Sequence, residues 1–233
     1  MAHLHAPRSL RVLARLLSYP DAELRAHIGD LRQALRAEQA VHSPRMAELE
    51  NLMTALEKND PVETEAEYVH LFDRGRSTSL HLFEHVHGDS RDRGPAMIDL
   101  AATYQQAGLY LAPGELPDYL PVVLEFVSTQ PVQQARAFLG EMSHIFKAIF
   151  SALQQRQSAY AAVLGALLEL GGERAEAIRF VPDEAIDATW EEPVAFDGCS
   201  SRGQSKPGQA QPIHFVKKEK TAAHGRPVAQ QGV

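Results

Sequence analysis

PVQQARAFLGEMSHIFKAIFSAL, residues 131–153, is the stretch of this chain that decides its fold class. After Pro131, apolar residues recur at spacings of three and four, the period that places side chains on one face of a helix. This wide apolar face comprises Ala135, Phe138, Leu139, Met142, Ile145, Phe146, Ile149 and Leu153. A Phe and Met stripe of this kind is typical of core packing, so the segment predicts a long buried helical region.

The same period and its start signals recur toward the N-terminus. Asp21 opens DAELRAHIGDLRQALRAEQ, whose apolar residues follow one buried stripe and predict a single helix. Ser43 with Pro44, and Asp60 with Pro61, each pair an N-cap residue with proline at the first helical position, where its missing N–H costs nothing. Two more helices are therefore expected, and the second should end near Phe72.

Glycines mark the expected helix ends in the second half of the chain. One helix should run from near Asp92 to Gly108, and another from about Ser158 to Gly171 and Gly172, because glycine accepts the left-handed conformation that closes a helix. Beyond Phe180, Gly, Pro, Ser and Gln accumulate and apolar periodicity is lost. The prediction is an all-α, single-domain helical bundle over residues 1–181, followed by a largely disordered, flexible tail over 182–233.

Length and residue usage indicate a cytoplasmic protein without membrane insertion. The longest apolar run, residues 159–168, is about half of the roughly 20 residues that a membrane-spanning helix needs. The N-terminus carries arginines at helical spacing and lacks the pattern of a secretory signal. Cys199, the single cysteine of 233 residues, has no partner for an intramolecular disulfide, which fits a reducing compartment.

Charge is distributed unevenly along the chain. From Cys199 onward there are six basic residues and one acidic residue, so this part carries +5 of a total of −7 and the preceding part carries −12. An acidic body repels phosphate backbones and argues against nucleic-acid binding. It favours a cationic partner such as an Arg-bearing peptide, although charge that serves only solubility is an equally good interpretation.

The HLFEH sequence at residues 81–85 has the H-x-x-E-H order of one class of zinc peptidase. His81 and His85 would share one side of a helix, Glu84 would activate water, and His87 adds a further nitrogen. No distal ligand is specified, and five-residue motifs arise by chance. We therefore expect no metal site and no enzymatic activity, and keep a zinc hydrolase as an alternative.

Residues 67–119 mix apolar, aromatic and acidic side chains in a way that favours peptide binding. The apolar members are Phe72, Leu80, Leu82, Phe83 and Tyr104, and the carboxylates are Asp73, Glu84, Glu115 and Asp118. Ordinary core packing is the competing interpretation for each aromatic side chain. The histidines at positions 81, 85 and 87 predict pH-sensitive binding, because imidazole titrates near neutrality.

Two stretches carry a family resemblance. EYVHLFDRGRSTSLHLFEHVHGDSRDRGPAMIDL at residues 67–100 and ELPDYLPVVLEF at residues 115–126 closely resemble the nitrate reductase molybdenum cofactor assembly chaperone, or delta subunit. The similarity is specific over about residues 65–130 and is supported by WEEPVAF and QPIHFV near the C-terminus. In wider terms the chain is similar to the redox-enzyme maturation chaperones.

The resemblance implies an all-helical, non-enzymatic chaperone. Its expected client is the apo catalytic (alpha) subunit of respiratory nitrate reductase, bound through that subunit's N-terminal segment, together with the beta subunit. Such a chaperone supports insertion of molybdenum bis-guanine-dinucleotide before membrane docking and holds no permanent cofactor of its own, since the cofactor belongs to the client. Proteins of cofactor biosynthesis are further expected partners.

The resemblance also points to site residues. Glu115, Pro117 and Asp118 match the family's acidic-Pro-Asp motif for peptide binding, whereas Tyr119 stands where many relatives have histidine. Combined with the residue pattern, the predicted peptide-binding set is Phe72, Phe83, Glu84, His85, Tyr104, Glu115, Pro117, Asp118 and Tyr119. A permanent structural subunit is the remaining alternative, and it would co-purify with the mature enzyme rather than with the apo form.

Overall fold

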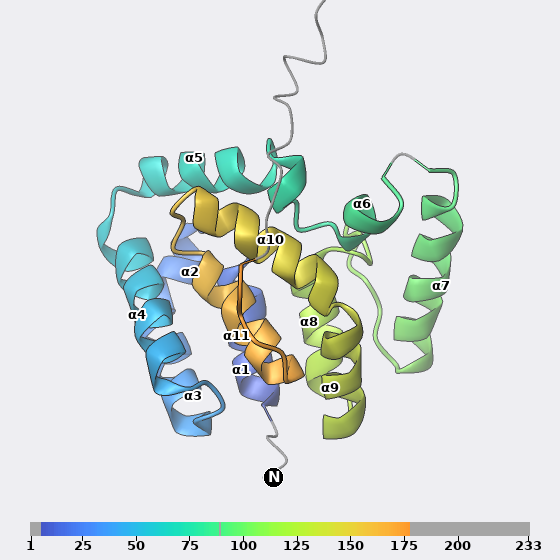
Figure 1. Cartoon of the computed structure of the whole chain (residues 1–233), viewed down its shortest axis with the longest axis horizontal. Helices are drawn as coiled ribbons and strands as arrows, with labels where there is room; N and C mark the ends of the chain where they lie inside the picture. The colour runs from blue at the N-terminus through green and yellow to red at the C-terminus, as the bar shows by residue number, and fades with distance from the viewer. Residues whose placement is uncertain (1–5, 89, 178–233) are drawn as a thin grey trace, which may run out of the picture. The chain divides into compact units, whose positions relative to one another are not determined.

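Helices follow one another along the chain in the computed structural model, which describes residues 6–88 and 90–177 (Figure 1). The α-helices are α1 (Pro7–Leu16), α2 (Ala22–Ala26), α3 (Ile28–Glu38), α4 (Ser43–Lys58), α5 (Pro61–Phe72), α6 (Leu82–Val86), α7 (Arg93–Gln106), α8 (Leu120–Thr129), α9 (Val132–Glu141), α10 (Ser143–Gln155) and α11 (Ala161–Gly171), with a 3-10 turn η1 (Arg76–Thr78). Among these residues the β-type pairing is confined to an isolated bridge. The predicted all-α class is confirmed, and the expected tail, 182–233, lies outside the described residues.

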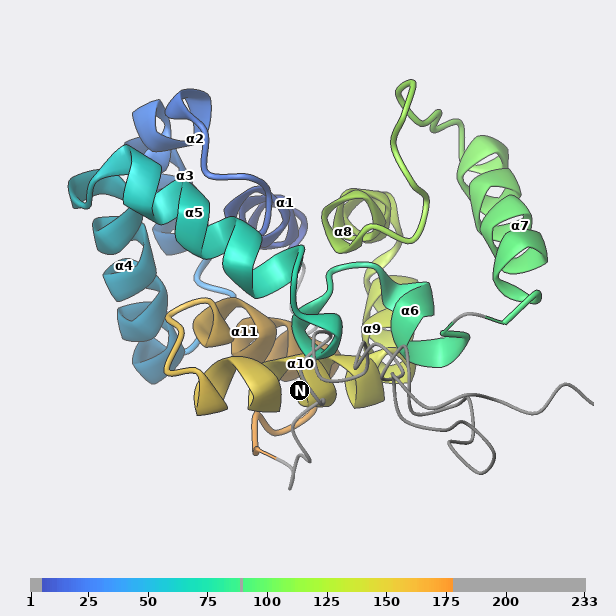
Figure 2. The same ribbon diagram turned by 90° about the horizontal axis from the view of Figure 1, so that it is seen from above.

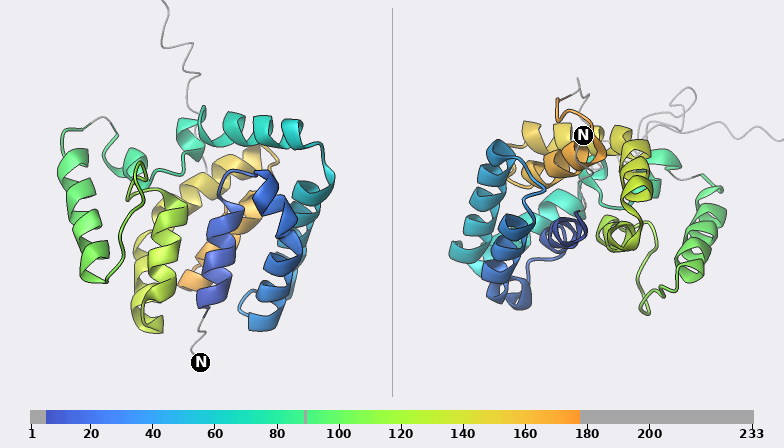
Figure 3. Two further views of the ribbon diagram at one scale, coloured as in Figure 1. Left: turned by 180° about the vertical axis from the view of Figure 1, so that it is seen from behind. Right: turned by 90° about the horizontal axis from the view of Figure 1, so that it is seen from below.

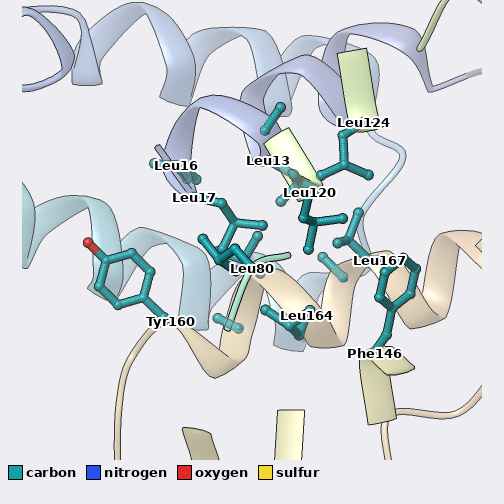
Figure 4. Packing of buried hydrophobic residues seen from close by; sticks show 14 of the residues in the cluster. Leu13, Leu16, Leu17, Leu80, Leu120, Leu124, Phe146, Tyr160, Leu164 and Leu167 are labelled. Carbon is teal, nitrogen blue, oxygen red and sulfur yellow. The ribbon is translucent and has the colours of Figure 1, made fainter. Parts of the chain in front are cut away.

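Helix α11 forms the centre of the core. Every residue from Ala161 to Leu168 is buried, because neighbouring helices cover all sides of this apolar helix. Figure 4 shows Leu164 and Leu167 of α11 close to leucines of α1 and α8 and to Phe146 of α10. Burying each such side chain contributes roughly 1.5–3 kcal/mol, so these contacts fix how the helices pack.

Carboxylates cap the starts of α2 and α5, and glycines close the ends of α7 and α11. Asp21 accepts the N–H of Leu24 at 2.7 Å, and Asp60 accepts those of Val62 and Glu63, as expected for N-caps. Gly108 and Gly172 take positive φ angles of 78° and 90° after α7 and α11. The predicted starts at Asp21 and Asp60 and the predicted glycine closures are therefore confirmed.

Two predicted continuous helices are divided. His27 separates α2 from α3, and Met142 separates α9 from α10. Near each break, a histidine ring nitrogen bonds to a carbonyl of the preceding turn: His27 Nδ1 to Glu23 O at 2.8 Å, and His144 Nδ1 to Glu141 O at 3.0 Å. Each of these bonds gives a carbonyl near the break a side-chain partner that competes with the regular helical pattern.

Helix α7 lies at the edge of the molecule opposite α3 and α4 (Figures 1 and 3). Tyr104 is its one buried residue, in contrast to the fully buried run in α11. From α7 the chain returns along the connection 107–119 to the start of α8 (Figure 2). This edge, with α6 between α7 and the bundle, contains most of the predicted site residues.

Candidate functional site

Two segments that lie far apart in sequence meet beside α6. His81 and Tyr119 form the isolated antiparallel bridge. On either side of it, Leu82 N donates to Asp118 O at 3.0 Å and Leu120 N donates to Leu80 O at 2.8 Å. The start of α6 is thus joined to the start of α8, which brings the two halves of the predicted site together.

Asp118 is fully buried at this junction. Its Oδ2 accepts the backbone N–H of Phe83 at 3.2 Å, and its Oδ1 lies 3.3 Å from His81 Nδ1. The Arg93 guanidinium lies 3.7 Å from Oδ2. Asp118 therefore acts as a cap for α6 from a distant part of the chain, and its charge reaches the surface only through its neighbours.

His81 is the titratable group that responds to this carboxylate. The hydrogen bond to Asp118 raises the pKa of His81, while partial burial opposes that shift. Its ring also lies against Tyr119, with centroids 5.4 Å apart. The Tyr119 hydroxyl in turn lies 3.1 Å from that of Tyr68, so tyrosine at this position extends the polar contacts into the core.

Three of the predicted residues are built into the core. Phe72 packs between Tyr68 and Tyr160, with ring centroids 4.8 Å and 5.1 Å away. Tyr104 donates its hydroxyl to the carbonyl of Pro117 at 2.8 Å, and both residues are buried. For Phe72 and Tyr104 the structure therefore supports core packing, the competing interpretation, over peptide binding. Burial also raises the pKa of the Tyr104 hydroxyl.

Four of the remaining predicted residues reach the surface. Phe83, Glu84 and His85 are half-buried on α6, and Glu115 is exposed. Glu84 pairs with Arg93 at 3.5 Å, and His85 Nε2 bonds to the carbonyl of Ser79 at 2.8 Å. We call the surface formed by Phe83, Glu84, His85, Val86, Glu115 and Leu116 the α6 surface.

Sequence reasoning missed the apolar members that are most exposed here. Val86 is 52% exposed and Leu116 45% exposed, and nearby Tyr110 and Ile98 are 80% and 71% exposed. Exposed large apolar residues that gather at one edge mark a binding surface more strongly than single ones do. Tyr110 and Leu116, which flank the Pro113-Gly114 turn, could have been predicted to be exposed from the sequence. Connecting segments lie on the surface, so large apolar residues next to a turn have few core positions to occupy.

The histidines of HLFEH are not arranged as the zinc-peptidase pattern requires. Helix α6 begins at Leu82, so His81 lies outside it, and its ring bonds to Asp118 while that of His85 bonds to a backbone carbonyl. Among the described residues, no group of three or more His, Cys, Asp or Glu side chains is placed to hold a metal ion. No helix in 6–88 or 90–177 has both the length and the apolar character to cross a bilayer.

Comparisons with known proteins agree with the fold and identify relatives of this chain. The sequence model of the family described as nitrate reductase delta subunit matches residues 19–165. The nitrate reductase molybdenum cofactor assembly chaperone NarJ of Escherichia coli, in strains K12 and O157:H7, is 41% identical over 193 residues, which cover 78% of this chain and 82% of NarJ.

A solved structure supports the architecture. The crystal structure of a redox enzyme maturation protein from Archaeoglobus fulgidus superposes with a TM-score of 0.51 and covers 72% of this chain and 95% of that protein. At 20% identity this likeness shows the fold alone. The family match and the identity to NarJ show more, and the chain belongs to the nitrate reductase delta subunit family of molybdenum cofactor assembly chaperones.

Proposed function

We propose that this protein binds the N-terminal segment of the apo catalytic subunit of a respiratory nitrate reductase and supports insertion of its molybdenum cofactor before membrane docking. It acts in the cytoplasm and is not a catalyst. Molybdenum bis-guanine-dinucleotide belongs to the client, whose beta subunit is present during assembly. The proteins that supply the cofactor are further partners.

The observation that carries the binding step is the composition of the α6 surface. Exposed Val86 and Leu116 provide apolar contact area, and Glu84 and Glu115 provide carboxylates for Arg or Lys of the client. A short peptide that becomes helical on binding would place its apolar side on the first pair and its cations against the second. Asp118 positions this surface rather than touching the client, because its carboxylate is buried.

Calorimetric titration with a synthetic N-terminal peptide of the catalytic subunit tests this proposal. Leu116 is 45% exposed, and covering this exposed surface with the peptide is worth about 1 kcal/mol. Leu116→Ser should therefore weaken binding about fivefold. Glu84→Gln should weaken it by a similar factor and reduce its salt dependence. Val62→Ser on α5, where Val62 is 73% exposed, is the matched control and should leave the affinity unchanged.

The client state provides a second test. A chaperone should capture the cofactor-free catalytic subunit and release the mature enzyme, whereas a permanent subunit would stay with both. Equal recovery of the two forms in a pull-down would reject the chaperone role. Equal affinity of wild type, Leu116→Ser and Glu84→Gln for the peptide would instead move the binding site away from the α6 surface.

A further inference from the structure

The described part of the chain contains a large groove well away from the α6 surface. It has a volume of about 890 Å³ and lies where the start of α1, the end of α8, the length of α9 and the end of α11 meet. Figures 1 and 3 show these helix ends together at the edge of the bundle opposite α5. The start of α8 is bonded to the segment before α6, whereas Val127 and Ser128 near the end of α8 line the groove.

The groove is apolar inside. Its lining includes Leu10, Val127, Val132, Ala135 and Leu139. They come from three helices. Leu10, Val127 and Leu139 are buried beneath the groove, and half-buried Val132 and Ala135 of α9 provide its accessible apolar surface. A concave apolar surface with a few polar groups at its edge is the usual form of a binding site.

Two arginines at this edge lack a carboxylate partner among the described residues. Arg136 is exposed, and its guanidinium lies against the backbone of Gly172, where any larger residue would collide with it. Arg11 is also exposed and donates from Nε to Ser128 Oγ at 3.0 Å, and Ser128 lines the groove. By contrast, Arg32 and Arg45 each pair with two glutamates.

Glu169 also lines the groove. Its Oε1 accepts from Arg45 Nε at 3.1 Å, whereas its Oε2 is buried without a hydrogen-bond partner in the described residues. Glu169 is therefore neutralised by Arg45 inside the protein, and its second oxygen is enclosed rather than open to the groove. Within the described part of the chain, Arg136 and Arg11 provide the unpaired charge at this edge.

We propose that this groove binds an acidic amphipathic segment of a partner protein. Its apolar side chains fill the groove, and its carboxylates pair with Arg136 and Arg11. The occupant's charge is the reverse of that expected for the client at the α6 surface. One cationic peptide therefore does not suit both sites. The protein thus has two docking sites of opposite preference, one at each end of α8.

Fluorescence anisotropy with two synthetic amphipathic peptides tests the groove directly. Both probes carry the same Leu/Ala stripe, and the polar face carries Glu in one and Lys in the other. The Glu probe should bind saturably, and the Lys probe about tenfold more weakly. Arg136→Glu should weaken the Glu probe about tenfold and strengthen the Lys probe, whereas Arg74→Glu, at an exposed position after α5, should change neither.

A second variant tests the groove without changing its charge. Ala137 lines the groove and is exposed, so Ala137→Trp should fill it and abolish binding of the Glu probe while circular dichroism shows an intact helical fold. Neither variant should alter affinity for the N-terminal client peptide, which separates this proposal from the α6 surface. Equal binding of the two probes, or binding indifferent to Arg136→Glu and Ala137→Trp, would overturn it. So would sedimentation showing a dimer that Arg136→Glu dissociates, because the occupant would then be a second copy of this chain.

Discussion

Replacing Asp118 by alanine should unfold the protein more easily and loosen α6 in particular. The carboxylate is fully buried and accepts the Phe83 N–H at 3.2 Å. Alanine removes this acceptor, so the start of α6 loses its cap and His81 loses its carboxylate neighbour. Helix α6 has five residues, too few to be stable without such contacts.

The cost follows from the contacts that are lost. A hydrogen bond from a backbone N–H to a buried carboxylate is worth about 1.5–3 kcal/mol, and this bond is also the helix cap, so the cap is not counted again. Arg93, 3.7 Å from the carboxylate, and His81 are both partly exposed. Solvent screening therefore makes the additional loss of stability from each of these two charge contacts small. The expected loss is about 2–3 kcal/mol of unfolding free energy, or roughly 4–12 °C in the midpoint of thermal unfolding.

Urea unfolding followed by far-UV circular dichroism measures this loss. Asp118→Asn keeps an oxygen that can accept from Phe83 and should retain part of the stability, which separates the hydrogen bond from the charge. Asp73→Ala, at an exposed aspartate after α5, is the control and should change stability by less than about 0.5 kcal/mol. If Asp118→Ala were as stable as wild type, Asp118 would not position α6, and direct contact with the client would again be the better explanation.

Three further variants probe the same edge of the molecule and the turn beside it. The pKa of His81 is raised in the folded state. Its contribution to stability is therefore fully present below the unfolded-state pKa of about 6.5 and is lost as pH rises through the higher folded-state pKa. In urea titrations, His81→Gln should cost more stability at mildly acidic pH than at pH about 8. Gly75→Ala should destabilise by about 1–3 kcal/mol, because the new Cβ would lie 2.8 Å from the carbonyl oxygen of Leu71. Tyr104→Phe should lower the thermal midpoint by the equivalent of about 1 kcal/mol, because its buried hydroxyl donates a 2.8 Å hydrogen bond.

Matched controls exist for all three. His70→Gln removes an exposed imidazole on α5 and is the control for the loss of a histidine as such. Gly29→Ala adds a Cβ with no atom within 4 Å, inside α3, and should stabilise slightly. Tyr110→Phe removes a hydroxyl from a residue that is 80% exposed and should be neutral. If a control variant changed stability as much as the variant it is paired with, the contacts described for His81, Gly75 or Tyr104 would not explain that variant's effect.

Helix starts and ends could be predicted from the sequence where a single residue and its near neighbours determine them. Asp60 caps α5 through bonds to residues two and three positions away, and Gly172 closes α11 by its own positive φ. The breaks at His27 and Met142 were not predicted, because the apolar period continues across each of them. A change of direction between packed helices depends on which neighbours lie on either side, and that information is not in the local pattern.

The candidate site shows the same division between local and long-range information. The sequence indicated residues 67–119, but it gave no means of telling the buried carboxylate of Asp118 from the exposed one of Glu115, three positions away. The difference arises from the bridge between His81 and Tyr119, which brings α6 over Asp118. The groove at the end of α8 was missed altogether, because its lining comes from α1, α8, α9 and α11 and no single segment reveals it.

The way α6 is attached bears on how a chaperone can bind and release its client. The α6 surface rests on a five-residue helix held by two backbone hydrogen bonds beside the bridge and by the cap from Asp118, whereas α11 is buried on every side. Segments with few buried contacts open at much lower free energy than the core does. If the client binds as proposed, covering Val86 and Leu116 would stabilise α6, and part of the binding energy would be used to order it. The affinity would then be lowered by that amount, and a more weakly held client would be released more readily.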